Sequence, residues 1–143
     1  MGIIKSAGLV IVCGDEILLC HPTNASWAGT YSISKGEMQD FESALDTAIR
    51  ETKEEIGLDF TEYFDDHSGI MDGIIDYRKK NSNKKYKSVF YFIVKLDEKL
   101  KIDKKKLQKE EVDWAGFMNK KEAEKKIFWR FKPILEKIFD HES

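Results

Sequence analysis

The chain of 143 residues is poor in the features that mark secreted, membrane and nucleic-acid-binding proteins. No apolar run approaches the roughly 18–20 residues of a membrane span, and the N-terminal residues lack the apolar run of a signal peptide. The 24 Lys and Arg against 26 Asp and Glu give a net charge of −2, so there is no overall basic field for nucleic acid. Two cysteines, Cys13 and Cys20, flank a tight turn inside apolar runs and are expected to be reduced. We therefore expect one cytoplasmic domain over residues 1–143, without membrane contact.

Apolar residues recur along the chain with periods that predict both strands and helices. Strands are expected at residues 6–12, 16–21, 31–34, 69–77 and 87–96. The first two strands form a hairpin around Gly14, and residues 119–140 form an amphipathic helix with a kink or break at Pro133. The aromatic residues of this tail are expected in the core or in a dimer contact: Phe128, Trp129 and Phe131. The order of elements predicts an α/β fold with a mixed sheet and helices packed over it.

Residues 40–57 change to helical periodicity and form the segment with the clearest chemistry. Asp40 is expected as the N-cap and Gly57 as the stop. One face carries a mostly apolar stripe of Phe41, Leu45, Ala48, Thr52 and Ile56. This stripe predicts that the helix packs one side against the sheet.

Another side of the same helix carries three glutamates. Glu51, Glu54 and Glu55 are spaced i, i+3 and i+4, so their carboxylates share one patch and repel one another. Arg50 and Lys53 are expected on other sides of the helix, where they cannot fully neutralise the patch. A hard divalent cation would neutralise the patch. Carboxylate ligands suit Mg²⁺ or Mn²⁺ better than Zn²⁺. A solvated acidic face is the alternative that the spacing alone leaves open.

The surrounding residues 36–58, GEMQDFESALDTAIRETKEEIGL, resemble the Nudix box G-x5-E-x7-R-E-U-x-E-E-x-G-U, in which U is a bulky aliphatic residue. The specified positions align without a gap: Gly36, Glu42, Arg50, Glu51, Glu54, Glu55, Gly57 and Leu58. The one departure is Thr52 at the first U position, whose hydroxyl needs a partner if it is buried.

The resemblance extends outside the box, over about residues 6–128. Residues 31–36, YSISKG, are similar to the W-S-I-P-K-G of one branch of this family, with Tyr31 in place of Trp and Ser34 in place of Pro. Residues 87–89 and 111–123 are similar to later segments of the family. The branch is that of diadenosine polyphosphate hydrolases and RNA 5′ pyrophosphohydrolases.

The resemblance implies an α/β/α sandwich and hydrolysis of a phosphoanhydride bond in a nucleoside diphosphate linked to another group. Mg²⁺, with Mn²⁺ as an alternative, would be held by Glu51, Glu54, Glu55 and the backbone carbonyl of Lys35. Arg50 would orient the glutamates by charge-assisted hydrogen bonds. These roles are carried over from the family pattern onto matching positions.

The general base would come from a later loop, where Glu111 has the family spacing. Glu110 is the second candidate, and Glu51 is the alternative within the box. Lys35 is expected to contact the substrate phosphates through its ammonium group.

A basic and aromatic segment follows in the sequence: Tyr77, Arg78, Lys84, Lys85, Tyr86 and Lys87. Lys87 and Tyr86 are candidate substrate-binding residues, because such a segment stacks bases and holds phosphates or an RNA 5′ end. The same lysines also fit a strand edge protected against aggregation.

The favoured substrate is a dinucleoside polyphosphate or 5′-triphosphate RNA. ADP-ribose and oxidised nucleoside triphosphates are alternatives, as is a non-catalytic nucleotide-sensing module. Monomer and homodimer both stay open.

Overall fold

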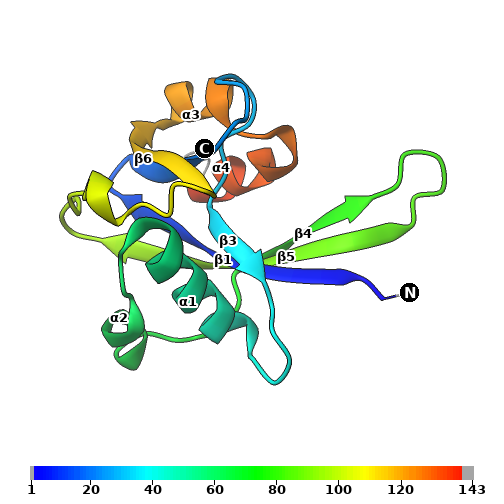
Figure 1. Ribbon diagram of the computed structural model, residues 1–143, viewed down its shortest axis with the longest axis horizontal. Coiled ribbons are helices and arrows are strands. Elements are labelled where there is room, and N and C mark those ends of the chain that lie inside the picture. The colour runs from blue at the N-terminus through cyan, green and yellow to red at the C-terminus, as the bar shows by residue number, and fades with distance from the viewer. Residues whose placement is uncertain (1, 140–143) are drawn as a thin grey trace.

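The computed structural model describes residues 2–139, in which six strands form one mixed sheet with helices on both faces (Figure 1). The strand order is β4-β5-β1-β2-β6, and β3 pairs with β1. Only the β1–β5 pair is parallel among the strand pairs of this range. The strands are β1 (Ile4–Cys13), β2 (Glu16–Pro22), β3 (Ser34–Glu37), β4 (Gly73–Arg78), β5 (Lys85–Leu96) and β6 (Val112–Asn119). The helices are α1 (Ala44–Ile56), α2 (Thr61–Asp65), α3 (Lys120–Lys126) and α4 (Lys132–Phe139), with short 3₁₀ turns η1 (Lys104–Lys106) and η2 (Trp129–Phe131).

The sheet separates two apolar cores, which confirms the predicted α/β sandwich. Val10 faces the core under α3 and α4, where Phe131 and Ile134 are fully buried. Its neighbours Leu9 and Ile11 face the opposite core, which α1 covers with Ala48 and Ile56. β1 is apolar on both faces because it lies in the middle of the sheet between two helical layers. No helix within residues 2–139 combines the length and apolar character that a membrane crossing requires.

The central helix begins later than predicted. Ser43, not Asp40, is the N-cap of α1, and its hydroxyl accepts a hydrogen bond from the Asp46 N–H at 3.1 Å. Phe41 is fully exposed, with a φ of 64°, so its expected place on the buried stripe is wrong. The end of the helix is as predicted: Gly57, with a φ of 74°, donates its N–H to the Lys53 carbonyl at 3.0 Å.

The tail divides into two helices, and the break precedes Pro133. At the break, Tyr31 donates its N–H to Lys126 O at 2.9 Å and accepts from the Phe128 N–H at 2.8 Å. These bonds hold Ile127 and Phe128 in extended conformation, so α3 ends at Lys126. Pro133 is the second residue of α4, where its missing N–H breaks no helical bond. Asp140, the last residue of the predicted helix, lies outside the described residues.

The strands of the β4–β5 hairpin run closer to its turn than predicted, and the hairpin extends beyond the other strands (Figure 1). β5 begins at Lys85 and β4 ends at Arg78, so all of the basic and aromatic segment except Lys84 belongs to the two strands, with a register shift between Tyr77 and Arg78. β4 begins at Gly73 instead of residue 69. The β1–β2 hairpin turns at Gly14, which has a φ of 58°, as predicted.

Candidate active site

The glutamate-bearing side of α1 faces a cavity of about 640 Å³ between α1, β3 and β5. β3 passes so close to α1 that a side chain at Gly36 would collide with Glu51: an added Cβ would lie 2.0 Å from the Glu51 carboxyl carbon. A glycine is required here because strand and carboxylate share this space. The close approach brings Lys35, one residue earlier, beside the glutamates.

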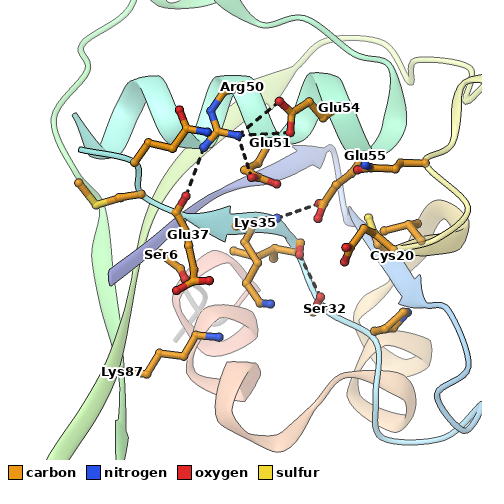
Figure 2. A pocket seen from close by; sticks show the side chains of 18 residues that line it. Ser6, Cys20, Ser32, Lys35, Glu37, Arg50, Glu51, Glu54, Glu55 and Lys87 are labelled. Atoms are coloured by element: carbon orange, nitrogen blue, oxygen red, sulfur yellow. Dashed lines mark hydrogen bonds and ion pairs between the residues drawn. The ribbon is translucent and has the colours of Figure 1, made fainter. Parts of the chain in front are cut away.

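The three glutamates form one wall of this cavity (Figure 2). Glu55 is only 8% exposed, and its carboxylate accepts a hydrogen bond from the Lys35 backbone N–H at 3.0 Å. Burial, with further repulsion from Glu51, raises the pKa of Glu55 to about 8. Burial also raises the pKa of Glu51, although Arg50 opposes that shift. The wall therefore concentrates more negative charge than its surroundings neutralise.

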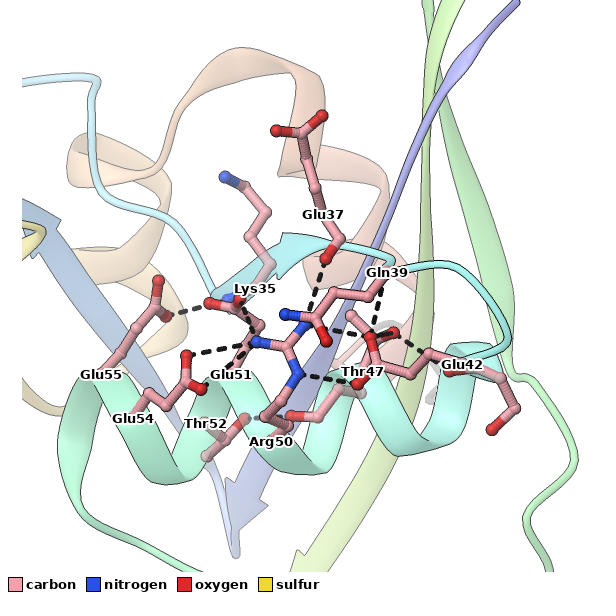
Figure 3. Close-up of polar contacts among 12 residues, drawn as sticks. Lys35, Glu37, Gln39, Glu42, Thr47, Arg50, Glu51, Thr52, Glu54 and Glu55 are labelled. Carbon is pink, nitrogen blue, oxygen red and sulfur yellow. Dashed lines mark hydrogen bonds and ion pairs between the residues drawn. The ribbon is translucent and has the colours of Figure 1, made fainter.

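Arg50 organises the carboxylates, contrary to the expectation that it lies on another side of the helix. Its long side chain bends along α1, so Nη1 donates to Glu51 at 2.9 Å and to Glu54 at 3.2 Å (Figure 3). Nε donates to Glu42 at 2.7 Å, and Nη2 donates to the Glu37 carbonyl at 3.2 Å. The Arg50 hydrogen bond, with smaller contributions from neighbouring donors, lowers the pKa of Glu42 to about 2.

As they stand, no three His, Cys, Asp or Glu side chains within residues 2–139 converge on a point that could hold a metal ion. The reason is visible in the contacts. Arg50 holds Glu51 and Glu54, whereas the Lys35 N–H holds Glu55. The donor set nevertheless fits a hard cation, because it consists of carboxylates whose mutual repulsion a cation relieves. Binding would require the carboxylates to turn away from Arg50.

Two lysines form the other wall. Figure 2 shows the amino groups of Lys35 and Lys87 together on the side of the cavity away from α1. Burial, and secondarily repulsion from Lys35, lowers the pKa of Lys87. Opposite charges thus face the same space, which suits an anionic substrate bound together with cations.

The family model of the NUDIX domain matches residues 3–138 of the chain. The chain belongs to the NUDIX family. Among solved structures, it is similar to the C. elegans Ap4A hydrolase, with 25% identity, 97% of each chain covered and a TM-score of 0.65. It also shares the fold of a MutT NUDIX hydrolase from Burkholderia pseudomallei, with 14% identity, 96% and 99% coverage and a TM-score of 0.74. The chain therefore carries a Nudix hydrolase domain.

A curated relative matches a shorter segment. The m7GpppN-mRNA hydrolase of Saccharomyces cerevisiae (strain ATCC 204508 / S288c) is 39% identical over 56 residues. That segment is 39% of this chain and 6% of the relative. The chain thus spans a small part of the curated relatives that it matches.

The structure separates the remaining predicted residues of the Nudix site into two groups. Glu111 lines the cavity, and its backbone is fixed by an N–H bond to Gln108 O at 2.8 Å. Glu110 and Tyr86 are not among the described residues that line it. Tyr86 lies farther out along β5, 39% exposed, with its ring 6.1 Å from that of Tyr77.

Sequence reasoning missed several residues of the Nudix cavity, including Ser6, Gln39 and Gln108. Glu37 also lines it, and its spacing from Lys35 in an extended segment was an available signal. Cys20 lies in the wall, where burial raises the pKa of its thiol and keeps it neutral. Both cysteines are free, as predicted.

Proposed function

We propose that the protein hydrolyses a phosphoanhydride bond in a nucleoside diphosphate linked to another group, with Mg²⁺ as cofactor. The observation that carries this proposal is the single cavity with a carboxylate wall on α1 and a lysine wall on β3 and β5. A pyrophosphate brings negative charge that repels an attacking nucleophile. A site for it needs fixed positive groups as well as positions for cations.

Glu51, Glu54 and Glu55, with the Lys35 carbonyl, would hold Mg²⁺, and Mn²⁺ suits the same donors. When bound, the ion would polarise the phosphoryl oxygens and lower the pKa of a bound water. The chain itself supplies the remaining functions. Lys35 and Lys87 neutralise the charge of the phosphate oxygens. Arg50 keeps its hydrogen bonds to those glutamates that do not bind the ion.

We assign the general base to Glu111. It lines the cavity, and it is close enough to Glu51 and Glu55 for its charge to raise the pKa of both. A carboxylate in this position can take the proton of an attacking water. Glu51 is the alternative base, at the cost of one ligand for the ion.

The preferred substrate under this proposal is a dinucleoside polyphosphate or a 5′-triphosphate RNA. Two lysines on one wall, opposite a carboxylate wall that suits cations, can contact several phosphates in a row. The similar solved structure is named an Ap4A hydrolase and the curated relative an m7GpppN-mRNA hydrolase, which supports this class. All box glutamates are present, which disfavours a non-catalytic sensing module. The free cysteines suit a reducing compartment such as the cytoplasm.

The experiment is a panel of nucleotides assayed with Mg²⁺ and with a chelator. We expect kcat/KM for a dinucleoside tetraphosphate or 5′-triphosphate RNA to exceed that for ADP-ribose by about tenfold, or some 1.4 kcal/mol. Lys35→Ala should remove most of this preference. Lys104→Ala, which changes an exposed lysine of η1, is the matched control.

Two results would contradict parts of this proposal. ADP-ribose or an oxidised deoxynucleotide as the best substrate would overturn the substrate class. An absence of metal-dependent hydrolysis across the whole panel would overturn the activity itself.

A further inference from the structure

A second cavity, of about 680 Å³, lies outside the candidate active site, between the β4–β5 hairpin and η2. We refer to it as the distal groove. Its lining residues are all basic or aromatic: Arg78, Lys79, Lys80, Tyr86, Trp129 and Arg130. The proposed hydrolysis needs none of them. Their composition therefore requires a separate explanation.

The aromatic part of the distal groove is built around Arg130. Its guanidinium carbon lies 4.6 Å from the centre of the Tyr77 ring and 4.4 Å from that of the Trp129 ring. Trp129 is 60% exposed, so a core position is wrong for it, whereas the alternative of a dimer contact stays a prediction. Phe131, two residues later, is buried as predicted. The chain thus holds a large aromatic surface in solvent, beside a cation that is fixed by stacking.

The charge of the groove is positive. Its lining contributes four basic side chains and no carboxylate among the described residues. The nearest acidic partner in the ion pairs of the hairpin is Asp76, which lies 3.6 Å from Arg78 and 3.8 Å from Lys85. The turn that carries the lysines is closed by the Lys79 N–H, which donates to Lys84 O at 2.8 Å. A neutral or cationic ligand would gain little from this charge, whereas repeated phosphates would be attracted.

The groove is also connected to the active site. Lys87, which lines the catalytic cavity, places its amino group 5.0 Å from the centre of the Tyr77 ring. Arg130 packs against the same ring. Tyr77 is buried, and its ring contacts one cation from the lining of each cavity. A row of cations therefore leads from Lys35 and Lys87 to the groove.

Edge protection explains only part of this arrangement. β4 is an edge strand, and lysines near an edge prevent pairing with another sheet. An exposed indole next to them has the opposite effect, because it favours contact with other molecules. The stack of Arg130 on Trp129 likewise serves no purpose in protecting a strand edge.

We propose that the distal groove binds the single-stranded RNA that follows a 5′ end held in the catalytic cavity. A base would stack on Trp129, and the phosphates would pair with Lys79 and Lys80. A dinucleoside polyphosphate has no phosphate beyond its second nucleoside, whereas RNA supplies one for each further nucleotide. Four cations in the groove therefore favour RNA. This inference rests on the proposed function with 5′-triphosphate RNA as the substrate.

Binding is measured with a fluorescent oligoribonucleotide of about ten nucleotides, a length within the usual range of single-strand sites. The oligonucleotide carries a 5′-hydroxyl, so it has no phosphoanhydride bond for the proposed reaction and reports on binding in the groove. We compare the wild type with Trp129→Ala and with the double variant Lys79→Ala/Lys80→Ala. The control is Lys104→Ala/Lys105→Ala, which removes the same charge from η1, beside α1 on the other face of the sheet.

Trp129→Ala should weaken binding by about tenfold, as the loss of one base–aromatic stack does. The lysine double variant should lower the slope of log K against log[salt] by about 1.4, since each phosphate contact on a single strand contributes about 0.7. The control should bind nearly as the wild type does. Failure of the wild type to bind, or equal binding by all variants, would overturn the proposal. Because the exposed lysine changes remove no core contact, a folding defect in Trp129→Ala would leave this test intact.

A second measurement separates the groove from the proposed activity. With 5′-triphosphate substrates, the groove variants should lower kcat/KM for the oligonucleotide by about tenfold but leave a mononucleotide triphosphate unchanged. Hydrolysis that does not depend on the length of the RNA would contradict the proposed role of the groove and would still agree with the proposed activity. Binding of the 5′-hydroxyl RNA without hydrolysis of any substrate would support the groove and contradict the activity.

Discussion

At the scale of single residues, two departures from the Nudix pattern compensate for one another. Ser34 and Thr52 are fully buried, and their hydroxyl oxygens lie 2.8 Å apart. Thr52 donates its one hydroxyl proton to Ala48 O at 2.7 Å, so Ser34 is the donor of the shared bond. The sequence predicted that Thr52 needs a partner. It did not predict Ser34, because that pairing depends on how β3 packs against α1.

This pair gives a prediction for stability. Thr52→Val should destabilise the fold by about 1–3 kcal/mol, because it leaves the Ser34 hydroxyl buried without an acceptor. Ser34→Ala should cost less, since Thr52 keeps its bond to Ala48. The double variant Ser34→Ala/Thr52→Val should lose about 1 kcal/mol less than the sum of the single variants. Urea unfolding measures all three, and additive losses would show that the two hydroxyls are not coupled.

Arg50 illustrates a second limit at this scale. Angular position on a helix predicted that it points away from the glutamates, yet it donates to both Glu51 and Glu54. A guanidinium on a long side chain can reach neighbours one turn away. Glu54 follows Arg50 by four residues, so the i, i+4 spacing itself places this pair on one side of the helix. Side-chain length decides only the contact with Glu51.

At the scale of elements, the sequence predicted β1, β2, β5 and the core of α1 well, but it placed β3 three residues too early and included no strand at the position of β6. The start of α1 was also misplaced. Asp40 and Ser43 are both good N-cap residues, so local preference cannot choose between them. The choice follows from Glu42, which Arg50 holds from the second turn of the helix. The break in the tail likewise follows from Tyr31, nearly a hundred residues earlier, through its bonds to Lys126 and Phe128. Such long-range contacts have no local signature.

The loop before β6 carries the prediction for the general base. Pairing of Val112 with Pro22 fixes this loop at the cavity, where Glu111 lines the site and Glu110 does not. Activity should fall in acid, because the ligands and the base must be deprotonated. Glu111→Gln should flatten the limb of the pH–rate profile that belongs to the base, whereas Glu110→Gln should leave the profile as in the wild type. An unchanged profile in Glu111→Gln would move the base to Glu51.

At the scale of the whole molecule, the fold gathers three glutamates on one wall of a cavity, with Arg50 beside them, and two lysines on the other wall. This arrangement strains the metal-free state. The pKa of Glu55 is raised to about 8 from an ordinary 4.5, so the folded chain binds its proton more tightly than the unfolded chain does. Stability from this group is therefore present below pH 4.5 and is lost as the pH rises toward 8.

Glu55→Gln removes that charge and keeps an acceptor for the Lys35 N–H. Without metal, the variant should be more stable than the wild type at pH 9 and lose this advantage near pH 4. The difference is expected to reach a few kcal/mol, since each pKa unit corresponds to about 1.4 kcal/mol. Thermal unfolding in a chelator measures it. A difference that does not change with pH would show that Glu55 carries no such strain.

The turnover number of the same variant tests the central claim most directly, namely that the glutamate wall of α1 supports metal-dependent hydrolysis. The measurement compares kcat of the wild type and Glu55→Gln in Mg²⁺, on the best substrate of the nucleotide panel. We predict that kcat falls by about a thousandfold or more, equivalent to roughly 4 kcal/mol, while the variant stays folded. Turnover by Glu55→Gln close to that of the wild type would contradict the account.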